Sequence, residues 1–123
     1  MAGEKLFESK VKRFLREYPE QIWFTKIWGG GYQKAGIPDL ICCVNGIFVS
    51  VELKASNGVS SDLQKRNTKL INKAGGIGII LYPEGFDSFK KLIMEVMECN
   101  LATAALNASK AVHTGTKCNI LTG

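Results

Sequence analysis

The chain contains few of the residue types on which many hydrolases depend. Its only histidine, His113, lies in a polar stretch near the end of the sequence. We therefore do not expect a histidine general base, a zinc hydrolase or an HNH-type nuclease. The four cysteines include no CxxC pair, and we interpret them as reduced, structural residues. Any chemistry should depend on carboxylates, lysines and a metal ion.

Long apolar runs and phosphate-binding signatures are also missing. No run of about eighteen apolar residues occurs, and no charged leader followed by an apolar segment opens the chain. The glycine-rich stretch 29–36 lacks the glycine-lysine pattern of a nucleotide P-loop, and no predicted helix follows it. We expect an intracellular protein that is neither secreted nor embedded in a membrane.

The composition is that of an ordinary globular chain with a basic balance. The 123 residues are 46% hydrophobic, which predicts one domain over residues 1–99 and a polar tail over 100–123 that is a short helix or a loose end. The formal net charge of +5 favours a polyanionic partner, although a lysine excess also serves solubility. Basic residues gather on two predicted helices, and a solvated surface explains each cluster equally well when it is considered alone. The clusters are Lys10, Lys12, Arg13 and Arg16, and Lys65, Arg66, Lys69 and Lys73.

Hydrophobic periodicity predicts an α/β fold in the order αβββαβα. The second predicted helix begins at a Ser60 or Ser61 cap and is expected to bury Leu63, Leu70 and neighbouring apolar residues. The last predicted strand is a continuous apolar run, which is typical of a strand buried on both faces in a parallel or mixed sheet. The predicted helices cover about residues 4–17, 61–74 and 86–99, and the predicted strands cover about residues 22–28, 40–44, 47–53 and 77–82.

One β-hairpin is predicted with a defined register. Asn45-Gly46 separates the apolar runs 40–44 and 47–53, which is the strongest short-range signal for a two-residue type I′ turn. If these two residues form the loop, Asp39 lies opposite Glu52. A β-bulge would add one residue and shift this register.

Two opposed carboxylates call for a compensating positive charge. Directly opposed residues have Cβ atoms about 4.5–5.5 Å apart, and like charges there are unfavourable. Lys54 projects from the same face as Glu52, because strand side chains alternate. A divalent cation such as Mg²⁺, which binds one or two carboxylates, water and phosphate oxygens, would bridge Asp39 and Glu52. The arrangement predicts metal-dependent phosphodiester cleavage, and the alternative is a surface hairpin with an ordinary salt bridge.

The residues of this hairpin also form a family motif. Gly36-Ile37-Pro38-Asp39 followed by Val51-Glu52-Leu53-Lys54 resembles the signature of the PD-(D/E)xK nuclease superfamily. The placement of Gly36 before Pro38-Asp39 is similar to the virus-type replication-repair branch, the VRR-NUC domains. The resemblance covers about residues 4–82 and extends to Glu8 and Gln64.

This resemblance implies a restriction-endonuclease-like core, in which helices cover a mixed central sheet, and a Mg²⁺- or Mn²⁺-dependent deoxyribonuclease. It adds the backbone carbonyl of Leu53 to Asp39 and Glu52 as a third metal ligand. We expect Lys54 to position the attacking water and to stabilise the charge that develops on the phosphate. The resemblance also implies that Glu8 faces inward, toward the metal or its water.

Two helical residues complete the predicted catalytic set. Glu8 lies at the border of the apolar stripe of the first helix, where a salt-bridged surface acid is the alternative, and Glu4 and Glu17 compete for its role. Gln64 lies in the first turn of the second helix, where amide N–H groups favour anions. A phosphate contact or a hydrogen bond to the active-site water is expected there, and a solvent-facing glutamine is the alternative.

The predicted partner is DNA, in particular branched or junction DNA as the VRR-NUC resemblance suggests. A chain this short has no room for a separate specificity domain, and symmetric incision of a four-way junction calls for a homodimer. Phe89, Ile93 and Met97 form either that interface or the monomer core. The family places the protein in the cytoplasm of a bacterial or phage-infected host cell. A non-catalytic basic DNA-binding module and an unspecific nuclease of the same fold are the alternatives. Candidate DNA contacts are Tyr32 and Lys34 in the glycine-rich stretch and Lys65, Arg66 and Lys69 on the second helix.

Overall fold

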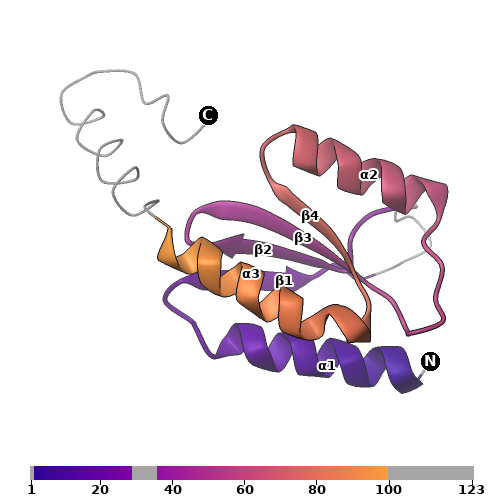
Figure 1. The fold of residues 1–123 in the computed structure, drawn as a ribbon, viewed down its shortest axis with the longest axis horizontal. Helices are drawn as coiled ribbons and strands as arrows, with labels where there is room; N and C mark the ends of the chain where they lie inside the picture. Colours follow the sequence, from indigo (N-terminus) through magenta and orange to yellow (C-terminus); the bar gives the residue numbers. More distant parts are fainter. Residues whose placement is uncertain (1, 29–35, 100–123) are drawn as a thin grey trace.

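A computed structural model describes residues 2–28 and 36–99 of the chain and contains a four-stranded mixed sheet with helices on both faces (Figure 1). The order of elements confirms the predicted αβββαβα arrangement and the α/β class. In these two ranges, no helix combines the length and the apolar character needed to cross a membrane. The elements are α1 (Ala2–Arg16), β1 (Ile22–Lys26), β2 (Leu40–Val44), β3 (Ile47–Leu53), α2 (Asp62–Lys73), β4 (Ile77–Leu81), the 3₁₀ turn η1 (Pro83–Gly85) and α3 (Phe86–Glu98).

The strands follow one another across the sheet in the order β1-β2-β3-β4. Strands β1 to β3 are antiparallel, and β4 is parallel to β3. The hairpin turn has positive φ at both central residues, 49° at Asn45 and 89° at Gly46, as a type I′ turn requires. Leu40 pairs with Val51, so the predicted register of the hairpin is confirmed and contains no bulge.

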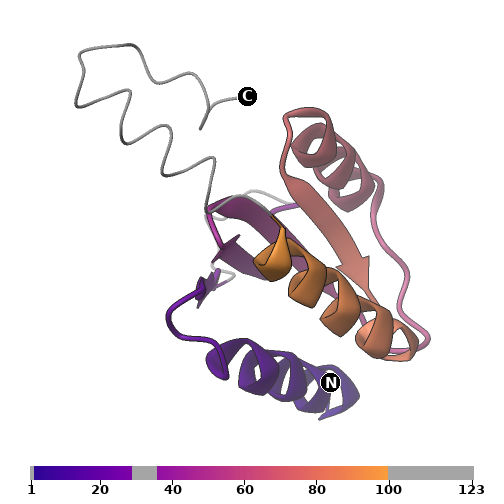
Figure 2. The same ribbon diagram turned by 60° about the vertical axis from the view of Figure 1, so that its left-hand side comes forward.

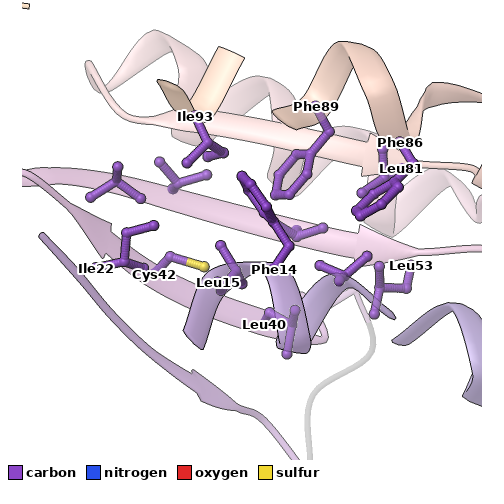
Figure 3. Packing of buried hydrophobic residues seen from close by; sticks show 14 of the residues in the cluster. Phe14, Leu15, Ile22, Leu40, Cys42, Leu53, Leu81, Phe86, Phe89 and Ile93 are labelled. Atoms are coloured by element: carbon purple, nitrogen blue, oxygen red, sulfur yellow. The ribbon is translucent and has the colours of Figure 1, made fainter. Parts of the chain in front are cut away.

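The hydrophobic core lies between the sheet and the helices α1 and α3, which cover the same face (Figure 2). Phe14 of α1 meets the rings of Phe86 and Phe89 of α3 edge to face at 6.2 and 6.1 Å between ring centroids. Figure 3 shows these rings over the buried strand residues. Phe89 and Ile93 are buried and Met97 packs against the core, so all three belong to the monomer interior.

Helix α2 covers the opposite face of the sheet near its β4 edge (Figure 1). The expected buried stripe is wrong, since α2 has no buried residue and Leu63 and Leu70 are 48% and 51% exposed. The helix is held by polar contacts: Asn72 both donates to and accepts from the backbone of Gly78 on β4. A Cβ on Gly78 would lie 2.8 Å from the Thr68 carbonyl oxygen, so this glycine permits the close approach. Strand β4 is an edge strand with mostly half-buried residues, and burial on both faces is not observed.

Candidate active site

The predicted site lies where several elements begin or end. Asp39 directly precedes β2, Glu52 and Leu53 end β3, and Gln64 is in the first turn of α2. Figure 1 shows the end of β3 and the starts of α1 and α2 at the same end of the molecule. The hairpin register thus delivers the two carboxylates to a point that α2 also reaches.

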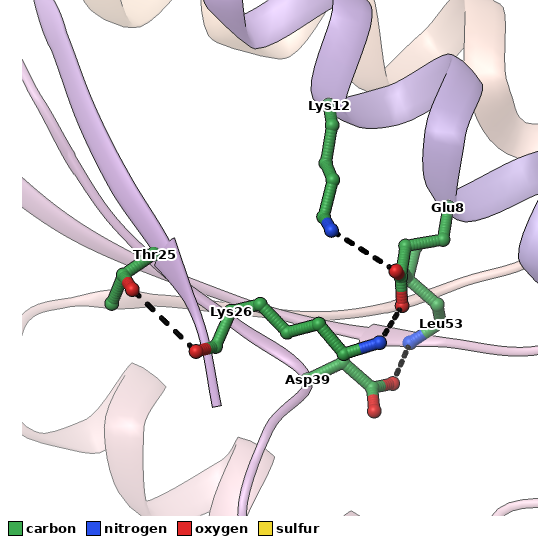
Figure 4. Close-up of polar contacts among 6 residues, drawn as sticks. All are labelled: Glu8, Lys12, Thr25, Lys26, Asp39 and Leu53. Carbon is green, nitrogen blue, oxygen red and sulfur yellow. Dashed lines mark hydrogen bonds and ion pairs between the residues drawn. The ribbon is translucent and has the colours of Figure 1, made fainter. Parts of the chain in front are cut away.

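Backbone groups hold Asp39 on both sides. The Leu53 N–H donates to Asp39 Oδ2 at 2.7 Å (Figure 4), and the Asp39 carbonyl accepts from the Ile27 N–H at 2.8 Å. The antiparallel register, continued past Leu40, would bring Pro38 opposite Leu53. Proline has no N–H to donate to the Leu53 carbonyl, which faces the same edge of the strand as the Leu53 N–H. This carbonyl is therefore a candidate ligand beside Asp39.

The segment before Asp39 is fixed against α2 through Gly36. The Asn67 side chain donates to the Gly36 carbonyl at 2.8 Å, and Gly36 has φ of +87°. A Cβ at this position would lie 2.9 Å from the Leu63 Cβ. Glycine is therefore required on both conformational and steric grounds. The motif glycine links the position of Asp39 to the position of α2.

Glu52 is a buried carboxylate with one bonded and one unbonded oxygen. Glu52 is only 5% exposed, and its Oε1 accepts a hydrogen bond from Gln64 Nε2 at 2.7 Å. Within residues 2–28 and 36–99, Oε2 has no hydrogen-bond partner. A buried polar atom without a partner is unfavourable and calls for an explanation such as a bound ion.

The electrostatic environment of Glu52 disfavours its charge. Burial, followed by the negative charge of Asp39, raises the pKa of Glu52 to about 7. Glu4, in the first turn of α1, raises the same pKa by a smaller amount, whereas the positive charge of Lys54 lowers it. Asp39, Glu52 and Lys54 therefore interact electrostatically, as the predicted constellation requires.

Gln64 connects the start of α2 to Glu52. Ser61 is the N-cap residue, and its hydroxyl accepts from the Gln64 N–H at 3.1 Å. In return, Gln64 Oε1 accepts from the Ser61 N–H at 2.9 Å, which completes a capping box and leaves Nε2 directed at Glu52. Gln64 is thus directed inward rather than toward solvent. It contacts the carboxylate itself, and its predicted roles toward phosphate or water stay predictions.

Lys54 follows β3, where its N–H donates to the Leu81 carbonyl at 3.0 Å. Its side chain is half-buried, and the described ranges contain no ion pair between Lys54 and either carboxylate. A Cβ on Gly58 would lie 3.4 Å from the Lys54 Cβ, so the loop after β3 passes closely beside this lysine.

Glu8 is held by two lysines. Figure 4 shows it between Lys12 and Lys26, with Glu8 Oε2 at 3.1 Å from Lys12 Nζ and Glu8 Oε1 at 2.6 Å from Lys26 Nζ. Burial acts to raise the pKa of Glu8, but the two lysines together outweigh it and keep the pKa below its ordinary value. The predicted role of Glu8 at the metal stays a prediction. Glu4 is the acid of α1 whose charge reaches Glu52.

The predicted DNA contacts on α2 form one exposed surface. We call it the α2 basic face; a groove of about 430 Å³ runs along it, which Asp62 and Leu70 also line. Tyr32 and Lys34 lie outside the residues that the structure describes. The α2 basic face consists of Lys65, Arg66, Lys69 and Lys73.

A larger cavity, of about 830 Å³, lies between α1 and α3. Aromatic residues such as Phe14, Tyr18 and Phe86 line it together with charges of both signs. Neither Asp39 nor Glu52 contributes to its wall, and α1 and α3 lie on the sheet face opposite α2. The cavity is therefore separate from the carboxylate pair.

The side chains suit a cation that is only partly ligated by protein. In the part of the chain that the structure describes, no group of three or more histidine, cysteine or acidic residues could hold a metal ion. The available donors are two carboxylates and the Leu53 carbonyl. Mg²⁺ commonly uses one or two carboxylates and retains several waters, so this oxygen-only set and the unpartnered Glu52 oxygen fit Mg²⁺.

Sequence reasoning missed the contacts that cross between elements. The Ser-x-x-Gln spacing at Ser61 and Gln64 is a recognisable capping-box signal, but it does not reveal the bond to Glu52. The pairing of Lys26 with Glu8 has no short-range signal in the sequence.

Comparisons of the chain with protein-family models, with curated proteins and with solved structures found no match. Function is therefore inferred from the site and its motif.

Proposed function

We propose that this chain is a metal-dependent deoxyribonuclease that hydrolyses phosphodiester bonds at Asp39 and Glu52. One observation carries the proposal: a buried glutamate beside a second carboxylate has one oxygen fixed by Gln64 and the other without a partner among the described residues. Burial and the charge of Asp39 both penalise the ionised Glu52. A divalent cation bound between the two carboxylates would offset both penalties. The alternative, an ordinary surface salt bridge, does not explain a buried carboxylate oxygen without a partner.

Asp39, Glu52 and the Leu53 carbonyl are the groups that would hold Mg²⁺ or Mn²⁺. When bound, the cation neutralises negative charge on the scissile phosphate and lowers the pKa of water. The Leu53 N–H orients Asp39, and Gln64 restricts Glu52 so that Oε2 is its open oxygen. The positive charge of Lys54 orients the attacking water and stabilises the negative charge that develops on the phosphate oxygens.

The motif and the fold order support a restriction-endonuclease-like core. The order αβββαβ and the hairpin that presents Asp39 and Glu52 agree with what the resemblance to PD-(D/E)xK and VRR-NUC nucleases implies. The α2 basic face lies on the same helix as Gln64 but on its other side, so it offers a phosphate-binding surface on the element that also holds Glu52. The proposal extends to branched or junction DNA and to a homodimer, because symmetric incision needs two sites related by a two-fold axis.

The decisive test is a cleavage assay on labelled duplex, flap and four-way-junction DNA with Mg²⁺, Mn²⁺ or EDTA. Asp39→Asn and Lys54→Ala are expected to reduce cleavage by at least about a hundredfold, since each removes a group that acts on the reacting phosphate. Matched controls are Asp87→Asn and Lys91→Ala, which replace exposed residues of α3 on the opposite face of the sheet. Both controls should retain the wild-type rate.

The outcomes distinguish the proposal from its alternatives. Metal-dependent cleavage that both site variants lose would establish the nuclease and rank its substrates. Binding without cleavage in any metal, with Asp39→Asn binding as tightly as wild type or tighter, would instead support a basic DNA-binding module. Equal rates on all three substrates would indicate an unspecific nuclease of the same fold. Sedimentation of the protein with junction DNA tests the homodimer.

A further inference from the structure

Trp28 is an unusually exposed aromatic residue beside the carboxylate site. It is one of two tryptophans in the chain, and 76% of it is accessible to solvent. Tryptophan is highly buried on average, so this degree of exposure needs an explanation. The residue plays no part in the hydrophobic core or in the carboxylate geometry.

The indole ring is contacted by a lysine and is otherwise largely exposed. Lys26 Nζ lies 4.7 Å from the ring centroid, which is the geometry of a cation–π contact. The same ammonium group pairs with Glu8 at 2.6 Å, so helix α1 fixes the support in place. With Lys12, the cluster carries two positive charges and one negative charge. Its net positive charge suits a polyanion.

The backbone places Trp28 beside the segment that carries Asp39. The Ile27 N–H donates to the Asp39 carbonyl at 2.8 Å, and Trp28 is the next residue along the chain. Consecutive Cα atoms are about 3.8 Å apart, so Trp28 leaves the backbone at the same end of the sheet as Asp39. A strand of DNA that extends past this end of the sheet would reach the exposed ring.

We propose that Trp28 is a stacking platform for an unpaired nucleobase, and that it gives this site its preference for single-stranded or branched DNA. The inference rests on the proposed function and specifies the substrate of the same site. Bases in an intact duplex are stacked on their neighbours, whereas an unpaired base offers a free π-face. Trp28 therefore selects the single-stranded segment of a flap or junction, and the carboxylates act on the phosphate close to it.

Trp23 provides a matched control within the same strand. It is 64% exposed, but it pairs with Cys43 near the other end of β1, away from Asp39. No lysine or arginine in the described ranges stacks on the Trp23 ring. The two residues thus have similar exposure and differ in support and location.

Single-tryptophan variants measure the stacking directly, in EDTA so that no cleavage occurs. Trp23→Phe leaves Trp28 as the sole tryptophan, and Trp28→Phe leaves Trp23. A single-stranded oligo-thymidine should quench the emission of Trp28, and a blunt duplex should quench it much less. The emission of Trp23 should not change with either. By anisotropy, Trp28→Ala should bind the oligo-thymidine about 5- to 150-fold more weakly, as expected for loss of one stacked base. Trp28→Tyr should retain part of the affinity.

Several results would overturn the inference. One is an unchanged Trp28 emission while anisotropy reports binding of the oligo-thymidine. Others are quenching of Trp28 by the duplex as strong as by the single strand, or quenching of Trp23 as strong as that of Trp28. The absence of binding to either oligonucleotide would also overturn it. A Trp28 emission that shifts on dilution without DNA would indicate a protein contact instead. Because the fluorescence and anisotropy measurements need no cleavage, they test the stacking site independently of the nuclease proposal. A quenched Trp28 without Mg²⁺-dependent cleavage leaves the stacking site standing, whereas cleavage with a silent Trp28 overturns the stacking site alone.

Discussion

Replacing Glu52 by glutamine is expected to stabilise the metal-free protein above about pH 7. Glutamine keeps an oxygen that can accept from Gln64 Nε2 and removes the charge that burial and Asp39 disfavour. The change therefore isolates the cost of ionising Glu52 inside the folded protein. It leaves the shape of the side chain nearly unchanged.

The magnitude follows from the pKa of Glu52. That pKa is raised from 4.5 to about 7, and each pKa unit corresponds to about 1.36 kcal/mol. The carboxyl is protonated in both states at low pH, so no cost arises there. Between these two pKa values the unfolded chain releases the proton and the folded protein retains it, so the free energy of unfolding falls as the pH rises. Above pH 7 the wild type should be less stable than Glu52→Gln by up to about 3 kcal/mol, or on the order of 10 °C in Tm.

Thermal unfolding in EDTA across this pH range measures the effect. The control is Glu20→Gln, which neutralises an exposed acid in a turn. The difference between Glu52→Gln and wild type should grow from about zero at acidic pH, and Mg²⁺ should raise the Tm of the wild type but not of Glu52→Gln. Equal stabilities at all pH values would refute the reasoning that Glu52 is a buried, electrostatically strained carboxylate. A response to Mg²⁺ in both proteins would refute Glu52 as a ligand.

Three further outcomes are expected. Gln64→Ala should lower the free energy of unfolding by about 2 kcal/mol and Ser61→Ala by about 1 kcal/mol. The difference arises because only Gln64→Ala also leaves Glu52 Oε1 without its hydrogen bond. Equal losses for the two variants in urea unfolding would argue against the Glu52 contact. Replacing the α2 basic face by glutamines should reduce the slope of log K against log salt by about 0.9 for each lost phosphate contact with duplex DNA, and an unchanged slope would exclude this face. Burial raises the pKa of the Cys42 thiol to about 12. Iodoacetamide should therefore modify the exposed Cys43 in the native protein and Cys42 only after unfolding. Tandem mass spectrometry of the peptide that contains both cysteines distinguishes the two sites.

The hairpin was predictable because its determinants are local. Asn45 and Gly46 accept positive φ at low cost, and this fixes a two-residue turn. Once the turn is set, the two-residue period of the strands places Asp39 next to Glu52 without reference to any other element. The start of α2 was equally local, since Ser61 satisfies an amide of the first helical turn.

Helix α2 shows where local pattern fails. Its apolar residues have helical spacing, yet Leu63 and Leu70 remain about half exposed. Spacing defines a face of the helix but not how much sheet lies beneath that face. Gly78 and Asn72 set the position of α2 near the β4 edge of the sheet, and in this position its two leucines stay partly exposed.

The sequence by itself determined the order of elements, the register of the hairpin and therefore the juxtaposition of the two carboxylates. These depend on backbone dihedral preferences and on side-chain period, which act over a few residues. Only the tertiary structure decided that Gln64 binds Glu52 and that Glu8 pairs with Lys26. Those contacts join residues from different elements. They depend on how helices pack against the sheet, which no local pattern encodes.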